Sequence, residues 1–367
     1  MRPAPPGWPP AAGPEPEVLI KEARRRQHRR YLLAGLAAVV LAGGAGVTLG
    51  LAGPGGHSSA RQDQRHVTYR AASTSPVPAW AKQLDGEVAY TCGDSVCLMR
   101  PDGTARYILP ATYPDRPTGP EWDPSWSPDG HRLAIRGYYG QGDGQYDLYV
   151  ADANGCHVTR LTRGLNGTSS SWSPTGRQIA FSVPLGIYVI NADGTGLRRL
   201  MASVSRYAYG VDTPAWSVSN RIAYARYLPP QRRTEIYTVN ADGSGNAALT
   251  RGGPGFVQPS WSPDGKSIAF MAVTVPRQFA GVIEVANADG TGRHRVSPPS
   301  WDSYSPTWTP GGKIVFLRQI GAPTQSTAAA TSAYIVNRDG SGLRLLYPHL
   351  DASQIAWGPT PLPRAGC

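Results

Sequence analysis

The chain has 367 residues, and 36 Lys plus Arg against 25 Asp plus Glu give it a formal net charge of +11. Its 43 Gly and 35 Pro favour turns, and charged residues make up only 17%, which argues against a large helical protein. Four Cys without a Cys-x-x-Cys pair argue against a disulfide scaffold and a structural zinc site, so mostly β structure is expected.

Residues 1–30 form the first segment, a Pro-rich and basic tail with five arginines within residues 24–30. Residues 31–52 carry no charge, and at about 1.5 Å per helical residue they are long enough to cross a bilayer core of about 30 Å. Basic residues precede this transmembrane helix, so the positive-inside rule predicts a cytoplasmic N-terminus and an extracytoplasmic remainder. The alternatives are a cleaved signal, which gives a secreted form, and twin-arginine export through Arg29 and Arg30. Residues 53–80, rich in Gly, Ser and Ala, are expected to be a flexible tether.

A repeat fills the rest of the chain, residues 81–367. Three of its elements recur: a tryptophan, a Ser-Pro-x-Gly turn as at residues 262–265, and a β-branched, apolar run as at residues 268–270. A second turn of the type Asn-x-Asp-Gly follows another apolar run, as at residues 287–290. The tryptophans lie 44 to 49 residues apart, at Trp126, Trp172, Trp216, Trp261, Trp308 and Trp357. Each repeat therefore predicts four short antiparallel strands, the content of one propeller blade.

Two incomplete repeats at the ends of this region complement each other. Residues 86–109 have the turn and the outer strands of a blade but no anchoring Trp, whereas residues 355–359 have a first strand and Trp357 but nothing more. We expect the C-terminal strand to complete this blade and to close a ring of six blades, which leaves no open sheet edge at the ends.

The segment 259–270 resembles the repeat of the TolB-type β-propeller family, and the resemblance extends over residues 86–357. It implies an all-β, six-bladed, extracytoplasmic propeller that mostly binds other proteins. TolB itself carries a small α/β domain before its propeller. Here a tether and a predicted membrane anchor stand in that place, so TolB's own envelope role is not transferred to this chain.

The repeated tryptophans are expected to be structural anchors that fill the space between neighbouring blades. The Asn-x-Asp-Gly turns have the composition of calcium loops but lack the distant bidentate acid that calcium needs. We therefore expect turn chemistry there, and no metal or cofactor.

Both tight turns of a blade fall at one end, so the longer connections gather on the opposite face, where binding residues concentrate. These connections are rich in aromatic residues and Arg, the composition of interface hot spots, although loop packing is the alternative role. The candidate binding residues are Tyr138, Tyr139, Tyr146, Tyr207, Tyr209, Arg226, Tyr227, Arg232, Arg233, Trp301 and Tyr304. Four acids before anchoring tryptophans are candidates for a channel mouth that attracts a cation or a basic peptide, with loop capping as the alternative. They are Asp123, Asp212, Asp302 and Asp351.

Catalysis finds little support in the sequence. No Gly-x-Ser-x-Gly motif occurs. Some relatives with similar repeats are lyases that hold a metal with channel histidines, but here His131 follows a turn and His157 and His294 map to outer strands. We expect no enzyme, and the extracytoplasmic location argues against a nucleic-acid partner.

Cys92 and Cys97 flank a four-residue hairpin loop, so they can approach within disulfide distance in an oxidising compartment. The pairing of Cys156 and Cys367 stays open.

The expected function is that of a membrane-anchored, extracytoplasmic propeller that acts as a protein-binding or scaffold module through its loop face. Its partner would be an envelope or secreted protein or peptide. The alternatives are the ectodomain of an envelope sensor and a glycan-acting lyase or hydrolase, with a small ligand or glycan in the central channel.

Overall fold

The computed structural model describes residues 77–93, 95–109, 121–139, 145–184, 186–202, 213–228, 233–253, 255–275, 280–321 and 330–359. The predicted cytoplasmic tail, the predicted membrane span and most of the tether lie outside these residues. Among the residues described, no helix is both long enough and apolar enough to span a bilayer. The described chain starts with a 3-10 helix, η1 (Ala79–Gln83), and continues in β-strands.

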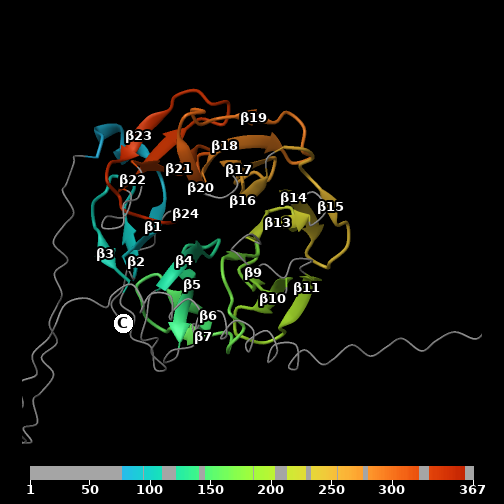
Figure 1. Ribbon diagram of the computed structural model, residues 1–367. Coiled ribbons are helices and arrows are strands. Elements are labelled where there is room, and N and C mark those ends of the chain that lie inside the picture. Colours follow the sequence, from blue (N-terminus) through green and yellow to red (C-terminus); the bar gives the residue numbers. More distant parts are fainter. Residues whose placement is uncertain are drawn as a thin grey trace, which may run out of the picture. The chain divides into compact units, whose positions relative to one another are not determined.

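The described strands form six four-stranded antiparallel sheets, which are arranged around a central channel as the blades of a propeller (Figure 1). The predicted all-β, six-bladed fold is thereby confirmed. In five blades the strand order follows the chain from an inner strand at the channel to an outer strand at the rim.

These five blades are numbered 1 to 5 in chain order. Blade 1 contains β4 (Glu121–Trp126), β5 (Arg132–Tyr139), β6 (Gln145–Asp152) and β7 (Thr159–Arg160). Blade 2 contains β8 (Ser170–Trp172), β9 (Gln178–Val183), β10 (Gly186–Asn191) and β11 (Arg198–Ala202). Blade 3 contains β12 (Ala215–Trp216), β13 (Arg221–Leu228), β14 (Arg233–Asn240) and β15 (Ala247–Ala248). Blade 4 contains β16 (Phe256–Trp261), β17 (Ser267–Val275), β18 (Ala280–Asn287) and β19 (His294–Arg295). Blade 5 contains β20 (Asp302–Trp308), β21 (Ile314–Ile320), β22 (Ala330–Val336) and β23 (Arg344–Tyr347).

Blade 6 joins the two ends of the propeller. It contains β24 (Ile355–Gly358), β1 (Glu87–Cys92), β2 (Ser95–Met99) and β3 (Tyr107–Ile108), in that order from the channel outward. The inner strand is therefore the last of the described chain, and Val88 of β1 lies opposite Trp357 of β24. This is the predicted closure by the C-terminal strand.

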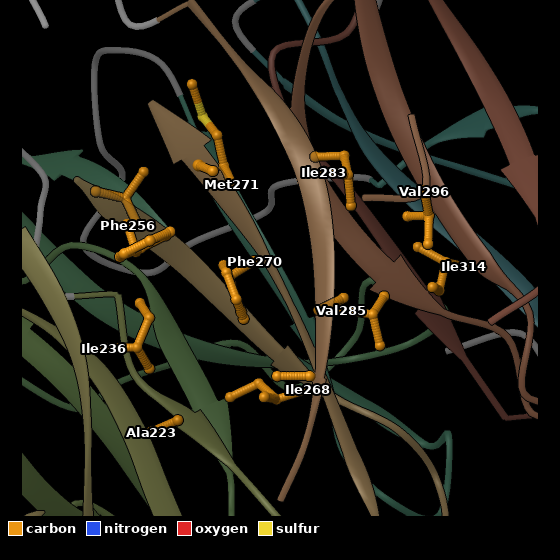
Figure 2. Packing of buried hydrophobic residues seen from close by; sticks show 14 of the residues in the cluster. Ala223, Ile236, Phe256, Ile268, Phe270, Met271, Ile283, Val285, Val296 and Ile314 are labelled. Carbon is orange, nitrogen blue, oxygen red and sulfur yellow. The ribbon is translucent and has the colours of Figure 1, made fainter. Parts of the chain in front are cut away.

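The middle strands are buried on both faces because each blade packs between two others. Along β17, every residue from Ile268 to Ala272 is 2% exposed or less. A sheet that is covered on both sides needs a continuous apolar run rather than an alternating one. Figure 2 shows the cluster shared by blades 3, 4 and 5, in which Phe270 of β17, Ile236 of β14 and Ile314 of β21 are all fully buried. Each such side chain contributes about 1.5–3 kcal/mol through burial.

The six repeated tryptophans lie at or near the ends of the inner strands and are 5 to 9% exposed. Three of them bridge to the preceding blade through the indole N–H. Trp172 Nε1 donates to the Ser125 carbonyl at 3.0 Å, Trp261 Nε1 to Ala215 at 3.1 Å, and Trp308 Nε1 to Ser260 at 2.9 Å. The recurring indole thus fills the space between blades and also links them.

The two turns of blade 4 use the chemistry that the sequence predicts. After Trp261, Ser262 Oγ donates to Asp264 Oδ1 at 2.6 Å and Gly265 adopts a φ of +67°. In the second turn Asp289 Oδ1 accepts from Thr291 N at 2.9 Å. Asp264 and Asp289 therefore stabilise their own turns. We call the end of the propeller that carries both turns the turn face, and the opposite end the loop face.

Two cysteine pairs were considered from the sequence. Cys92 and Cys97 form a disulfide with a Cα–Cα distance of 5.8 Å, at the loop end of β1 and β2. Cys156 is also disulfide-bonded. Cys367, whose pairing the sequence left open, lies outside the described part of the chain.

Candidate functional site

The described members of the predicted binding face lie at strand ends on the loop face. In blades 1 and 3 they lie where the two middle strands meet, and in blade 5 they lie at the start of the inner strand. They are Tyr138, Tyr146, Arg226, Tyr227, Arg233, Trp301 and Tyr304. The side chain of Tyr139 and the residues Tyr207, Tyr209 and Arg232 lie outside the described part of the chain.

In blade 1 an arginine lies between an aromatic ring and a buried acid. Tyr138 and Tyr146 face each other across β5 and β6, with ring centroids 5.4 Å apart in an edge-on arrangement. The Arg136 guanidinium lies 4.4 Å from the Tyr146 ring centre, and its Nη1 is 3.3 Å from Asp123 Oδ2. Burial raises the pKa of the Asp123 carboxyl above its ordinary value, and the positive charge of Arg136 opposes that rise.

Blade 5 carries a similar stack at the start of its inner strand. The Arg318 guanidinium lies 3.9 Å from the Trp301 ring centre, and the Trp301 and Tyr334 rings are 4.6 Å apart. Arg318 Nη1 also donates to the Tyr334 hydroxyl at 3.3 Å. Beside it, the Tyr304 hydroxyl donates to the Ala352 carbonyl at 3.4 Å, and burial raises the pKa of Tyr304 to about 12.

In blade 3 the two candidate arginines have different surroundings. Arg226 lies over the Tyr237 ring at 4.9 Å. Arg233 Nε is 2.9 Å from Glu235 Oε1, and Glu235 is buried and accepts from Thr250 Oγ1 at 2.6 Å. Arg233 therefore belongs to an internal network that fixes the loop after β15. Arg226, in contrast, stacks on an aromatic ring near the loop-side end of β13.

The predicted channel-mouth acids differ from one another in exposure. Asp123 is 8% exposed and is ion-paired with Arg136, so it has a partner within the chain. Asp302 and Asp351 are exposed. Asp212 lies outside the described residues.

A polar girdle surrounds the loop-side end of the channel, and of its members only Asp123 was predicted from the sequence. Asp123, Gln258 and Ser305 adopt left-handed φ values of 59°, 54° and 52° at bulges in their inner strands. Gln258 Oε1 accepts from Ser305 N at 2.8 Å, and Ser305 Oγ accepts from Ile355 N at 3.4 Å. The Gln354 side chain hydrogen-bonds to the Asp123 carboxylate. Blades 4, 5, 6 and 1 are thereby linked in sequence, and the only shared sequence signal is that each bulged residue precedes a proline.

The described histidines do not converge on the channel. His131 and His294 are exposed on the turn-face side, and His157 Nδ1 lies 2.6 Å from Asp152 Oδ2 near the second turn of blade 1. In the part of the chain that the structure covers, no group of three or more His, Cys, Asp or Glu side chains is placed to hold a metal ion.

No family model matches the sequence. Over 161 residues the chain is 30% identical to the Tol-Pal system protein TolB of Francisella tularensis, an alignment that covers 40% of this chain and 34% of that protein. The crystal structure of TolB from Acinetobacter baumannii matches with a TM-score of 0.60 at 18% identity, over 77% of this chain and 68% of that one. The described domain is a TolB-like six-bladed β-propeller.

A second solved structure is similar to this chain over almost its own entire length. A putative TolB from Agrobacterium tumefaciens has a TM-score of 0.54 at 18% identity, over 76% of this chain and 99% of that one. The alignment with the curated Francisella protein, in contrast, spans only about a third of that relative's length. The similarity to TolB structures therefore establishes the propeller fold.

Proposed function

We propose that this chain is an extracytoplasmic protein-binding propeller, held at the membrane by residues 31–52, that captures a protein or peptide segment on its loop face. The TolB-like propeller supports the general class, since the curated relative is named as a Tol-Pal system protein. The proposal assigns no catalytic step to the chain.

The observation that carries the proposal is a set of three stacked arginines on the loop face. Arg136 lies on Tyr146, Arg226 on Tyr237, and Arg318 on Trp301, at 3.9 to 4.9 Å. All three arginine residues are half-buried and lie in the loop-side halves of their strands. Arg, Tyr and Trp are the residue types that dominate interface hot spots.

Stacking also prepares these side chains for binding. An arginine that is free in solvent loses rotamer entropy when a partner fixes it, whereas a stacked one has already lost much of that freedom. The planar guanidinium donates hydrogen bonds to carboxylate and carbonyl oxygens. The partner segment is therefore expected to offer acidic side chains or free backbone carbonyls.

Capture by the purified chain from a detergent-solubilised envelope extract, read by mass spectrometry, tests this proposal. The loop-face variant combines Tyr138→Ala, Tyr227→Ala and Arg226→Gln, which spares Arg233 because that side chain pairs with buried Glu235. The control variant combines Leu197→Ala and Arg199→Gln, both exposed on the turn-face side of blade 2. A partner held by the wild type and the control but lost by the loop-face variant supports the proposal. A partner held equally by all three proteins contradicts it.

The membrane part of the proposal has a separate test. The full chain should stay in the membrane fraction after alkaline carbonate extraction, and deletion of residues 31–52 should release it. Extraction of the full chain by carbonate would argue for a cleaved signal instead.

A further inference from the structure

The turn-side half of the central channel holds a cavity that is separate from the loop face. Its volume is about 380 Å³, within the range of about 300–1,000 Å³ that is usual for small-ligand sites. Equivalent short segments of all six inner strands line it, as Pro259, Ser260 and Trp261 do in blade 4. None of its described lining residues carries a charge.

Backbone groups of the inner strands face the cavity. The N–H of the residue after each of five anchoring tryptophans donates within its hairpin, as Ser262 N does to the Ser267 carbonyl. In an antiparallel ladder the preceding residue then directs its N–H and C=O away from the partner strand, here toward the channel side. One of these N–H groups is taken up by the preceding blade, because Trp216 N donates to Ser171 Oγ at 2.9 Å. In blade 6, Trp357 N likewise donates to Thr307 Oγ1 at 3.3 Å.

Proline removes further donors from this wall. Four of the six inner strands have proline two residues before the anchoring tryptophan, and proline has a carbonyl but no N–H. These residues are Pro124, Pro214, Pro259 and Pro306, and all four line the cavity. Each of these prolines therefore adds a carbonyl acceptor to the wall without an N–H donor.

Two carboxylates stand next to the cavity on opposite sides of the ring. Asp129 of blade 1 and Asp264 of blade 4 directly follow the lining residues Pro128 and Pro263. Both are exposed. Hydrogen bonds from Ser262 and from the backbone lower the pKa of Asp264. For Asp129, burial acts to raise the pKa but hydrogen bonds from Ser127 and the backbone outweigh it, so both acids are ionised at neutral pH.

The chain itself shows how a guanidinium fits such surroundings. Arg132 lies 4.7 Å from the Trp172 ring centre and donates to the Gly176 carbonyl at 3.0 Å. Arg221 lies 6.0 Å from the Trp261 ring centre and donates to the Ala288 carbonyl at 3.3 Å. Each of these arginines reaches from its own blade to the next one on the turn-face side. There its guanidinium lies over an indole ring and donates a hydrogen bond to a backbone carbonyl.

We propose that the axial cavity is a binding site for a guanidinium cation, the arginine side chain of a peptide that approaches the turn face. A guanidinium has five N–H donors and no acceptor, which complements a wall of carbonyl and hydroxyl oxygens. Asp129 and Asp264 supply negative charge beside the lining residues, although Arg132 and Lys266 also lie close to them. The guanidinium plane can stack on indole. This site is independent of the loop-face function, because none of the stacked arginines or their aromatic partners lines it.

Titration of the full chain with N-acetyl-arginine amide tests the site, with N-acetyl-citrulline amide as an uncharged control of nearly the same shape. The readout is the ¹H–¹⁵N spectrum of ¹⁵N-indole-labelled protein, since five tryptophans line the cavity. Saturable shifts are expected with a weak Kd, about 1–10 mM. Citrulline should give no saturable shift. Equal shifts with both probes, or no saturation with arginine, would overturn the proposal.

Two variants separate this site from general anion–cation attraction. Asp129→Asn with Asp264→Asn keeps the turn acceptors but removes both charges, and should weaken binding at least threefold. Ser260→Lys places a resident cation in the cavity and should abolish binding while thermal unfolding shows a folded chain. If Ser260→Lys does not fold, the double Asn variant decides. Unchanged arginine affinity in the double Asn variant, or in a folded Ser260→Lys protein, would overturn the proposal, whereas the loop-face variant should bind like the wild type.

Discussion

The indole ring of Trp126 in blade 1 lies directly against the backbone of Gly358 in blade 6. A Cβ atom at position 358 would lie 2.6 Å from the Cγ and Cδ2 atoms of that ring, well inside van der Waals contact. The other inner strands have Ser or Thr at this position after the tryptophan. The contact stands where the C-terminal strand closes the ring, so closure depends on a residue without a side chain.

Gly358→Ala should therefore destabilise the propeller by about 1–3 kcal/mol, the usual cost of overpacking. The measurement is the urea midpoint of unfolding. Gly311→Ala is the matched control, because a Cβ there would meet nothing closer than 3.9 Å and the residue has no positive φ. Equal effects of the two substitutions would show that the contact with Trp126 does not limit closure.

The indole bridges between blades give a second prediction. Trp261→Phe removes the hydrogen bond to the Ala215 carbonyl, whereas Trp126 Nε1 makes no hydrogen bond within the described chain. Both substitutions remove the same atoms from a buried ring. Trp261→Phe should thus cost about 1 kcal/mol more than Trp126→Phe, the typical net value of one hydrogen bond. Calorimetric unfolding of the two variants checks the difference, and equal losses would contradict a linking role for the indole N–H.

Buried Glu235 should be among the most sensitive polar residues of the fold. Its carboxylate accepts from Thr250 Oγ1 at 2.6 Å and from Gly252 N at 3.0 Å, and it pairs with Arg233 at 2.9 Å. Glu235→Gln puts an amide donor against these donors and removes the charge, at an expected cost of about 3 kcal/mol. Glu284→Gln, which breaks a more exposed pair with Arg293, should cost less than about 1 kcal/mol. Chemical denaturation compares the two, and similar small losses would show that the Glu235 network does not hold the loop.

The second turns make stability depend on acid pH. Hydrogen bonds from the hydroxyl of a nearby Thr or Ser lower the pKa of the turn aspartates Asp193, Asp242, Asp289 and Asp339. Because the folded pKa lies below the unfolded value of about 3.9, these groups stabilise the fold above that pH, and the contribution is lost as the pH falls through the folded pKa.

Replacing all four turn aspartates by Asn keeps an acceptor in each turn but removes the titration. The variant should lose less stability than the wild type between about pH 5 and pH 2. The reason is that its four turn sites no longer bind a proton more tightly in the unfolded state than in the folded state. Urea midpoints measured across this range check the slope. An unchanged slope would mean that other carboxylates govern acid unfolding.

The blade number and the closure could be predicted because they are written in local patterns. The spacing of the six tryptophans sets one blade per repeat, and the half-repeats at residues 86–109 and 355–359 can complete a ring in only one way. Turn residues such as Gly265 also act locally, because a positive φ is required at that position.

The contacts at strand bulges and between blades could not be predicted, because they depend on local strand irregularities and on how neighbouring sheets meet. The pairing of Arg136 with Asp123 lies within blade 1 but spans a bulge in β4, which the strand pattern of the sequence does not reveal. The residues of the girdle differ in type, from Asp123 to Gln258 and Ser305, so only the following proline marked them. The axial cavity likewise arises only after all six inner strands are in place.

The affinity of the wild-type chain for its captured partner, measured beside the loop-face and turn-face variants, tests the central claim most directly. The account predicts that the loop-face variant binds at least about tenfold more weakly, as expected when hot-spot side chains are removed. The turn-face variant, Leu197→Ala with Arg199→Gln, should bind with unchanged affinity. A loss confined to the turn-face variant, or equal affinity of all three proteins, would contradict the assignment of binding to the loop face.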